Sequence, residues 1–163
     1  MKTTFNATAI KKICKKEPLQ YGKHNDNIIA WDKRGLFAIS CNSLFFELEI
    51  KNKIPTTETD IPSCIIKNFD YFENNETTVL NETFLQMELS NATARLYQNI
   101  KYKYFTPVNI ELLKIINNIA DFTPYQYKQN TAILFKNDYI KIIIMPLRND
   151  NIKEKLTDIL QAV

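Results

Sequence analysis

Residues 138–150, with the sequence DYIKIIIMPLRND, form the most hydrophobic run of the chain and constrain its fold more than any other segment. A short apolar run between polar turns is typical of a strand that is buried on both faces. We expect this strand to stop at Pro146, because proline has no N–H to donate to a neighbouring strand. Residues at the end of the strand can also line a binding surface, and the run alone leaves both interpretations open.

Two earlier stretches predict the same order of elements, namely strand, helix and three strands. In residues 2–50 we expect a strand at 2–6, a helix at 8–16, and strands within NIIAWD, LFAISCN and LFFELEI. In residues 57–106 a strand entering at TDIPS and a helix in CIIKNFDYF precede strand patterns in TTVLNE, TFLQMEL and TARLYQNIKYKYF. The stretches share this pattern and no residue-level identity.

A third segment, 107–163, starts with a helix pattern in IELLKIINNIA and continues with a hairpin of TAILFKN and YIKIIIMPL. Its last residues predict an amphipathic helix, because apolar side chains recur there at helical spacing: Ile152, Leu156, Ile159, Leu160 and Val163. We therefore expect an α+β fold with mostly antiparallel strands. It would comprise a domain at 1–106, made of half-units 2–50 and 57–106, and a further half-unit with the C-terminal helix at 107–163.

The composition is that of a folded domain, with 45% hydrophobic and 24% charged residues. A net charge of +3 permits an anionic partner and does not require one. The three cysteines, Cys14, Cys41 and Cys64, are widely spaced among apolar residues, which indicates reduced core thiols in a cytoplasmic protein. The N-terminus has no apolar signal segment, and no apolar run approaches the length of a membrane span, so we expect no membrane partner.

The sequence offers little for catalysis. Its one histidine, His24, lies in a polar loop, where a solvated side chain is the usual interpretation. The cysteines have no metal-ligand spacing, and two glycines cannot form a glycine-rich phosphate loop. Glu47 and Glu49 fall on one face of an expected strand, either as a carboxylate pair or as a solvated edge. We therefore expect no enzymatic activity and no cofactor or metal.

The helix at 8–16 carries a stripe of lysines. At 100° per residue the stripe lies opposite the apolar face of Ile10, Ile13 and Cys14, and it consists of Lys11, Lys12, Lys15 and Lys16. Such a stripe can neutralise phosphates, which releases counterions and makes binding dependent on salt. It includes no base-reading residue, so this binding would not depend on sequence. The alternative is a solvated face in a lysine-rich chain.

Residues 98–107, QNIKYKYFTP, interleave tyrosines with lysines, a composition typical of a stacking platform for single strands. Alternation along a strand gives a simpler interpretation. Ile100, Tyr102 and Tyr104 would then face inward, whereas Lys101 and Lys103 would face solvent and protect a sheet edge. We favour this second interpretation.

The order of elements and several local runs resemble the bacterial DNA polymerase sliding clamp family. MKTTFNATAIKKICKK is similar to its opening strand and helix, and NIIAWDKRGLFAISCNSLFFELEI to its first run of three strands. TTETDIPSCIIKNFDYF is similar to the strand and helix that follow, and YIKIIIMPLR to a closing strand that ends on Met-Pro-hydrophobic-Arg. The resemblance implies repeated strand–helix–three-strand units, an antiparallel sheet, and helices on one face that surround DNA. Because such a clamp subunit has three domains, a chain of this length would form a ring only as a homo-oligomer.

The resemblance also implies two kinds of site. The inner helices of the family face duplex DNA with basic residues, and the matching positions here are Lys11, Lys12, Lys15, Lys16, Lys67 and Lys114. The closing strand lines a cleft for peptides of polymerases and other replication proteins, and the matching positions are Ile143, Met145, Pro146 and Leu147. We therefore expect a non-catalytic DNA-clamp-like protein, of a phage or mobile element, that binds replication partners, duplex DNA or both. The alternative is a protein-interaction module or inhibitor with this fold that binds no DNA.

Overall fold

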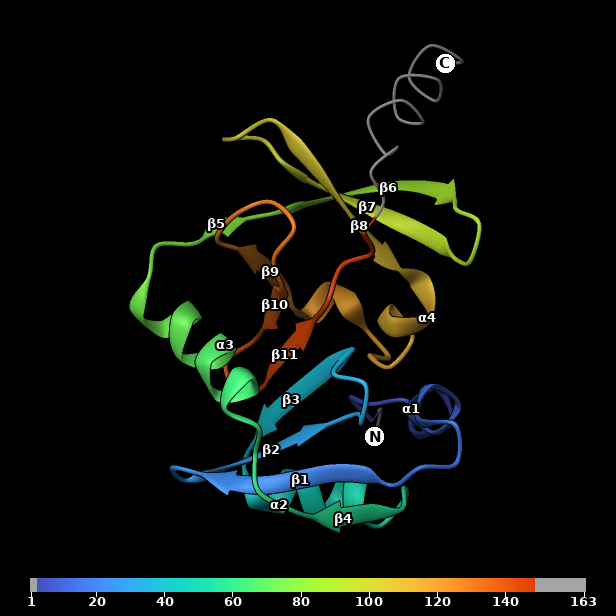
Figure 1. Cartoon of the computed structure of the whole chain (residues 1–163), viewed down its shortest axis with the longest axis vertical. Helices are drawn as coiled ribbons and strands as arrows, with labels where there is room; N and C mark the ends of the chain where they lie inside the picture. Colours follow the sequence, from blue (N-terminus) through green and yellow to red (C-terminus); the bar gives the residue numbers. More distant parts are fainter. Residues whose placement is uncertain (1–2, 149–163) are drawn as a thin grey trace.

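The computed structural model describes residues 3–148, and its largest element is an eight-stranded sheet (Figure 1). The strands lie in the order β4 (Thr56–Glu58), β1 (Leu19–His24), β2 (Asn27–Trp31), β3 (Phe37–Cys41), β11 (Lys141–Ile144), β10 (Ile133–Lys136), β9 (Thr123–Gln126) and β5 (Thr78–Val79). The pair β1–β4 is parallel, and every other neighbouring pair is antiparallel. Since β11 pairs with β3, the last described strand completes a sheet that the N-terminal strands begin.

A second sheet of three strands consists of β6 (Asn81–Glu88), β7 (Thr93–Asn99) and β8 (Tyr104–Asn109). Gln126 of β9 ties it to the large sheet. The hydroxyls of Tyr104 and Thr106 donate to Gln126 Oε1 at 3.1 and 3.0 Å, and Gln126 Nε2 donates to the Thr131 carbonyl at 2.8 Å. Because the Gln126 side chain is fully buried, these bonds satisfy polar atoms that water cannot reach.

Helices cover both faces of the eight-stranded sheet. Ile10 and Ile13 of α1 (Ala7–Cys14) belong to the core on one face, as do residues of α4 (Ile110–Leu113). Ile65 and Phe69 of α3 (Ser63–Asn74) belong to a separate core on the other face. The expectation that the helices share one face is therefore wrong. Successive residues of β2 and β11 point to opposite faces and are apolar on both, so each face needs its own cover.

Residues 44–50, expected as a strand, are helical instead. They form α2 (Ser43–Phe46) and a π-helical turn, η1 (Glu47–Lys51). Asn42 begins this helix, because its Oδ1 accepts from the Phe45 N–H at 2.8 Å. Phe46 and Ile50, four residues apart, are buried, so helical spacing prevails over the alternation that suggested a strand.

Conversely, the polar stretch that leads to His24, expected as a loop, is β1. Leu19 and Tyr21 supply its buried face. Gly22 is needed there because a Cβ at this position would lie 2.7 Å from Ile61 Cγ1, where the chain crosses after β4.

The expected order of strand, helix and three strands is not reproduced in the described residues: in 2–50 the first strand is a single bridge and the last expected strand is helical, and in 57–106 four strands follow the helix. In 57–106 the chain does run from β4 and α3 into β5 and β6–β8, but β4 and β5 belong to the large sheet. The strands β9–β11 continue that same sheet, so a division at residue 106 cuts through it. The predicted hairpin at Asn137-Asp138 is confirmed as β10–β11, whereas β9 was not predicted.

The helix expected at 110–120 ends after α4, followed by a 3-10 turn, η2 (Ile119–Asp121). The chain between them turns back to the N-terminus, where Asn6 N–H donates to the Ile115 carbonyl and Asn117 N–H to the Thr4 carbonyl, both at 2.9 Å. The strand expected at 2–6 is accordingly reduced to a single bridge between Phe5 and Ile116.

The long strand expected at 93–105 is divided by a turn between β7 and β8. Asn99 Oδ1 accepts from the Tyr102 N–H at 3.0 Å and closes this turn. Ile100 and Tyr102 are 61% and 55% exposed, so their predicted inward orientation is wrong. The predicted C-terminal amphipathic helix lies outside the described residues. Within those residues, no helix is long and apolar enough to span a bilayer.

The cysteines give a first testable prediction. Burial raises the pKa of Cys14 to about 11 and that of Cys41 to about 12, whereas Cys64 is exposed at the start of α3. A thiolate reacts and a buried thiol does not, so a thiol reagent should modify Cys64 rapidly in the native protein. We expect one thiol to react before unfolding and all three afterwards. Cys64→Ser should abolish the rapid phase, and rapid modification that survives in this variant would contradict the prediction.

Candidate functional site

The largest cluster of predicted site residues lies at the C-terminal end of α1. The predicted lysines of α1 and the two residues after it lie there, and Lys114 follows α4. Lys33 and Arg34 of the β2–β3 turn lie beside them and were not predicted. We call this set the α1 basic surface: Lys11, Lys12, Lys15, Lys16, Lys33, Arg34 and Lys114. All seven residues are exposed.

Local sequence explains why α1 stops where it does. Asn6 begins the helix, because its Oδ1 accepts from the Ala9 N–H at 3.1 Å. The helix ends at Cys14, and Lys15 and Lys16 follow with φ of 50° and 69°. Lys15 donates its N–H to the Lys11 carbonyl, which is the αL form of a helix C-cap. The last two lysines therefore project from a tight turn beyond the helix.

Arg34 connects this end of α1 to the turn between β2 and β3 of the large sheet. Its Nη2 donates to the Ile13 carbonyl at 2.7 Å, which satisfies one of the free carbonyls at the helix C-terminus. Its Nε lies 3.9 Å from Oδ2 of Asp32, a carboxylate that is only 1% exposed. A cation at this end also interacts favourably with the helix dipole. The β2–β3 turn thus holds the basic surface in place.

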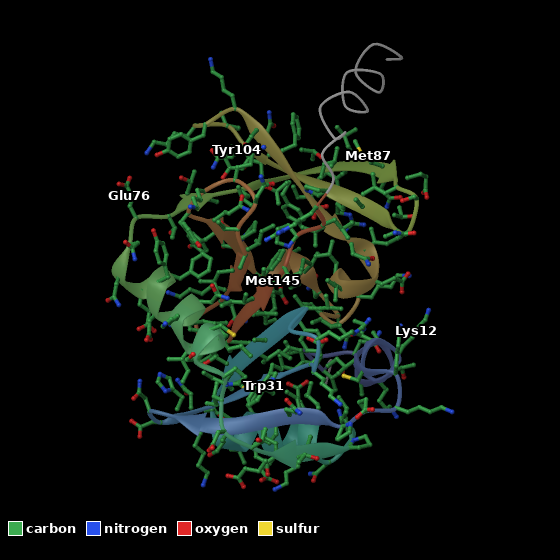
Figure 2. All side chains as sticks on the ribbon, viewed as in Figure 1. Lys12, Trp31, Glu76, Met87, Tyr104 and Met145 are labelled. Atoms are coloured by element: carbon green, nitrogen blue, oxygen red, sulfur yellow. The ribbon has the colours of Figure 1, made fainter. Side chains whose placement is uncertain are left out.

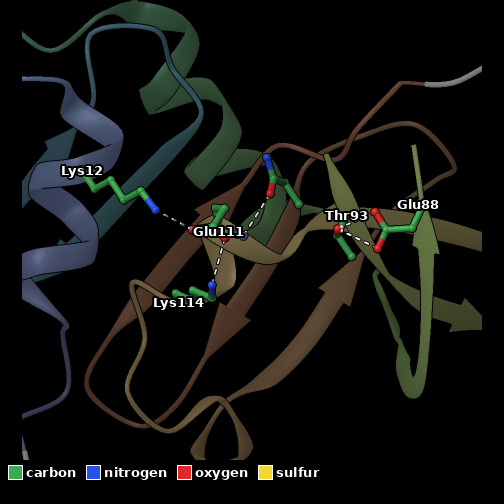
Figure 3. A network of polar contacts seen from close by, with 6 residues as sticks. Lys12, Glu88, Thr93, Glu111 and Lys114 are labelled. Atoms are coloured by element: carbon green, nitrogen blue, oxygen red, sulfur yellow. Dashed lines mark hydrogen bonds and ion pairs between the residues drawn. The ribbon is translucent and has the colours of Figure 1, made fainter. Parts of the chain in front are cut away.

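Glu111 of α4 joins the two helices within the surface. Its carboxylate lies 3.7 Å from Lys12 Nζ and 2.9 Å from Lys114 Nζ, as Figure 3 shows. The hydrogen bond from Lys114 lowers the pKa of Glu111. Lys11, Lys15 and Lys16 form no ion pair with any residue in the range 3–148, so they are available to an anionic partner.

Lys67, the remaining lysine matched to a DNA-facing helix, does not join this surface. It lies on α3, which covers the opposite face of the large sheet. Figure 2 shows the same separation, with Lys12 and the α3 helix on opposite sides of the view. No single surface of the molecule therefore presents lysines from both α1 and α3, as a ring lined by helices requires.

Two of the four residues matched to a peptide cleft line a small cavity, and Pro146 and Leu147 do not line it. Ile143 and Met145 line a cavity of about 20 Å³ together with Ile65 of α3, and Ile143 is buried. That volume holds one water molecule and no peptide side chain. Met145 is partly buried and packs against the core that α3 covers (Figure 2). A peptide side chain could enter this small cavity only if α3 moved, so the cleft stays a prediction.

The end of the apolar run is fixed by backbone bonds on either side of Pro146. The strand β11 ends at Ile144, and the Met145 N–H donates to the Leu36 carbonyl at 3.0 Å. After the proline, the Leu147 N–H donates to the Pro107 carbonyl at 2.9 Å. Pro146 thus stands where the chain leaves the large sheet and reaches β8 of the second sheet.

The candidates for chemistry are scattered. His24 Nε2 lies 3.5 Å from the Asn25 side chain and ends β1. Glu47 pairs with Lys51 at 3.3 Å, whereas Glu49 accepts from the Thr4 N–H at 2.6 Å, so the two acids serve different contacts. Within residues 3–148, no group of three histidine, cysteine, aspartate or glutamate side chains is placed to hold a metal ion.

Sequence reasoning missed a polar cluster between the two sheets, made by Glu82, Arg95 and Tyr97. These side chains line a cavity of about 370 Å³ with several apolar residues. Arg95 and Tyr97 are two apart in β7 and so share a face, which is the one signal that the sequence offered. Glu82 could not be placed, because a bulge shifts the alternation of β6.

Comparison of the chain with protein-family models, curated proteins and solved structures gave no match to any of them.

Proposed function

We propose that this chain is a non-catalytic binding protein that contacts the phosphates of duplex DNA through the α1 basic surface. The observation that carries the proposal is the concentration of charge. The surface has seven basic residues, and within residues 3–148 their ion pairs involve three acidic residues, Glu17, Asp32 and Glu111. The surface therefore holds more positive charge than the whole chain, whose net charge is +3.

The chemistry of the surface favours phosphates over bases. Lysine is a point charge that binds phosphate without fixed geometry, and Arg34 is engaged with Ile13 and Asp32. Binding would thus be independent of sequence and sensitive to salt. Because α1 and α3 lie on opposite faces of the sheet, contact would occur on one side of the molecule without encirclement.

The proposal can be tested by fluorescence anisotropy with short labelled duplexes of two unrelated sequences. If about four phosphates are neutralised, affinity should fall about 100-fold between roughly 50 and 200 mM salt, equally for both sequences. A variant with Lys11, Lys12, Lys15 and Lys16 changed to glutamate should bind at least about 100-fold more weakly at the lower salt.

A matched control carries the same change of net charge elsewhere. Lys23, Lys53, Lys67 and Lys128 are all exposed and lie outside the α1 basic surface. Changing these four to glutamate should leave most of the affinity intact. An equal loss in both variants would show that net charge decides binding, and the proposal would then be wrong. If the unaltered protein binds neither duplex at low salt, the alternative function, a protein-interaction module without DNA binding, is favoured.

A further inference from the structure

A cavity of about 370 Å³ lies between the second sheet and the β9–β10 part of the large sheet. Residues of β6 and β7 form one wall, and residues of η2, β9 and β10 form the other. The apolar part of the lining includes Leu80, Phe84, Ile119, Phe122, Pro124 and Phe135. Mostly apolar walls with a few convergent polar groups are typical of ligand-binding cavities of this size.

The polar groups of the cavity have hydrogen-bonding capacity to spare. Arg95 Nε lies 3.1 Å from Glu82 Oε1, but at an angle at which no hydrogen bond forms. The hydroxyl of Tyr97 is buried as well, and none of these three atoms has a hydrogen-bond partner within residues 3–148. Buried polar atoms are almost always satisfied in folded proteins, because leaving one unpaired is costly. Glu82 and Arg95 compensate each other as an ion pair, so the Tyr97 hydroxyl beside them is the atom with capacity for a further partner at this cavity.

The strand that borders the cavity is distorted at the same place. Glu82 pairs with Tyr97 and Gln86 with Arg95, so residues 83–85 face Leu96 alone across the sheet. The Thr83 hydroxyl bridges this bulge by donating to the Leu96 carbonyl at 2.8 Å and accepting from the Leu85 N–H at 3.1 Å.

Phe84 sits at the tip of the bulge with φ of 60° and an 81% exposed ring, on the rim of the cavity. A bulky residue with positive φ is a strained exception, and such strain gathers at binding sites.

The charges in the cavity define the chemistry of its ligand. Glu82 and Arg95 neutralise each other, so an ionic ligand would leave one of these partly buried charges unpaired. Burial raises the pKa of Tyr97, and the Glu82 carboxylate adds to the effect, so this hydroxyl stays protonated and can donate. The cavity thus offers an acceptor at Glu82 and donors at Arg95 and Tyr97, which complement the N–H and C=O of a neutral amide.

We propose that this cavity binds a peptide segment of a partner protein through one backbone amide and an apolar side chain. The amide N–H donates to Glu82, its carbonyl accepts from Arg95 or Tyr97, and the side chain packs among Phe122, Pro124 and Phe135. Because β6 is the edge strand of its sheet, an extended segment can approach along it, and the exposed Phe84 ring can cover the bound residue. This site is separate from the α1 basic surface and does not depend on DNA binding.

The test uses a minimal probe, N-acetyl-leucine N-methylamide, titrated into the full-length, isotope-labelled protein and followed by NMR. We expect a saturable shift of the Arg95 Nε–H resonance and of backbone amides in β6 and β7. The charged analogue N-acetyl-leucine, which ends in a carboxylate, should shift these resonances far less. Equal binding of the two probes, or no shift at Arg95 with the neutral one, would overturn the proposal.

Two variants separate binding from folding. Tyr97→Phe removes only the hydroxyl and should weaken binding of the neutral probe about 10-fold, the usual size for one lost hydrogen bond. Its thermal midpoint should stay level or rise, because a buried unpaired hydroxyl is lost. Tyr139→Phe is the matched control, since Tyr139 is 80% exposed, and should change neither quantity. Glu82→Gln, with Glu58→Gln as its exposed control, should also weaken binding, and unchanged affinity in both cavity variants would refute the site.

Discussion

Replacing Asp32 with alanine is expected to lower the free energy of unfolding by about 3 to 4 kcal/mol, because it leaves buried donors without a partner. Asp32 Oδ1 accepts from the N–H groups of Leu36 and Phe37 at 2.6 and 3.1 Å, and Oδ2 accepts from that of Arg34 at 3.3 Å. The carboxylate is 1% exposed, so water cannot replace these bonds. One side chain thereby fixes the whole turn between β2 and β3.

The loss should also reach the α1 basic surface. Asp32 lies beside Arg34, whose guanidinium holds the end of α1 through the Ile13 carbonyl. Without the carboxylate, Arg34 loses its anchor and the end of the helix should fray. We therefore expect Asp32→Ala to weaken DNA binding beyond the effect of its stability loss, measured at a temperature where the variant remains folded.

Urea denaturation followed by circular dichroism measures the main effect. Asp32→Asn keeps one acceptor oxygen and should lose less than Asp32→Ala. Asp26→Ala is the matched control, because Asp26 is exposed in the turn between β1 and β2, and it should change stability by less than about 0.5 kcal/mol. A loss below about 1 kcal/mol for Asp32→Ala would show that the turn holds without the carboxylate.

The sequence predicted well those elements whose pattern has one interpretation. The apolar run near the C-terminus is a buried strand, and the stretches 27–32 and 36–42 each contain one, because continuous apolar residues suit a strand covered on both faces. The same feature reveals why the helices could not share a face. An alternating strand leaves one face polar, whereas Ile28 and Ile29 point to opposite faces and both are buried.

Segments with two compatible patterns were predicted less well. LFFELEI alternates like a strand, yet it also places Phe46 and Ile50 at helical spacing after a capping asparagine. The N-cap decides this case, and propensity alone does not. The strand β1 was not predicted from the sequence because it contains Gly22. Its lack of a side chain serves the contact with Ile61, a distant residue, so no local pattern could show it.

The two candidate sites also differ in how far local sequence patterns could predict them. The α1 lysines were visible because they share a helix, and Lys114 joins them through Glu111, an acid that the sequence did not connect to α1. The cavity cluster required three events that no local pattern encodes. First, β7 pairs with a β6 strand that contains a bulge. Second, the second sheet packs against β9 and β10. Third, the Tyr97 hydroxyl has no hydrogen-bond partner within the described residues.

Phe135→Ala should have the largest effect on stability, a loss of about 3 to 5 kcal/mol. The Phe135 ring is 0% exposed and packs edge-on against Tyr97, with centroids 5.6 Å apart and planes at 80°. It therefore joins β10 of the large sheet to β7 of the second sheet, and truncation would leave an apolar void next to the cavity.

A double-mutant cycle, with stability measured by chemical denaturation, tests this contact between the two sheets directly. Phe135→Leu keeps most of the volume and should lose less than about 1.5 kcal/mol, while Phe84→Ala, at an 81% exposed ring, should lose less than about 0.5 kcal/mol. Combining Phe135→Leu with Tyr97→Leu should reveal a coupling of about 0.5 to 1.5 kcal/mol between the two rings. Two results together would contradict this prediction: stability losses of the two leucine variants that simply add, and a loss for Phe135→Ala no larger than that for Phe135→Leu. The two sheets would then be held together elsewhere, at the hydrogen bonds of Gln126.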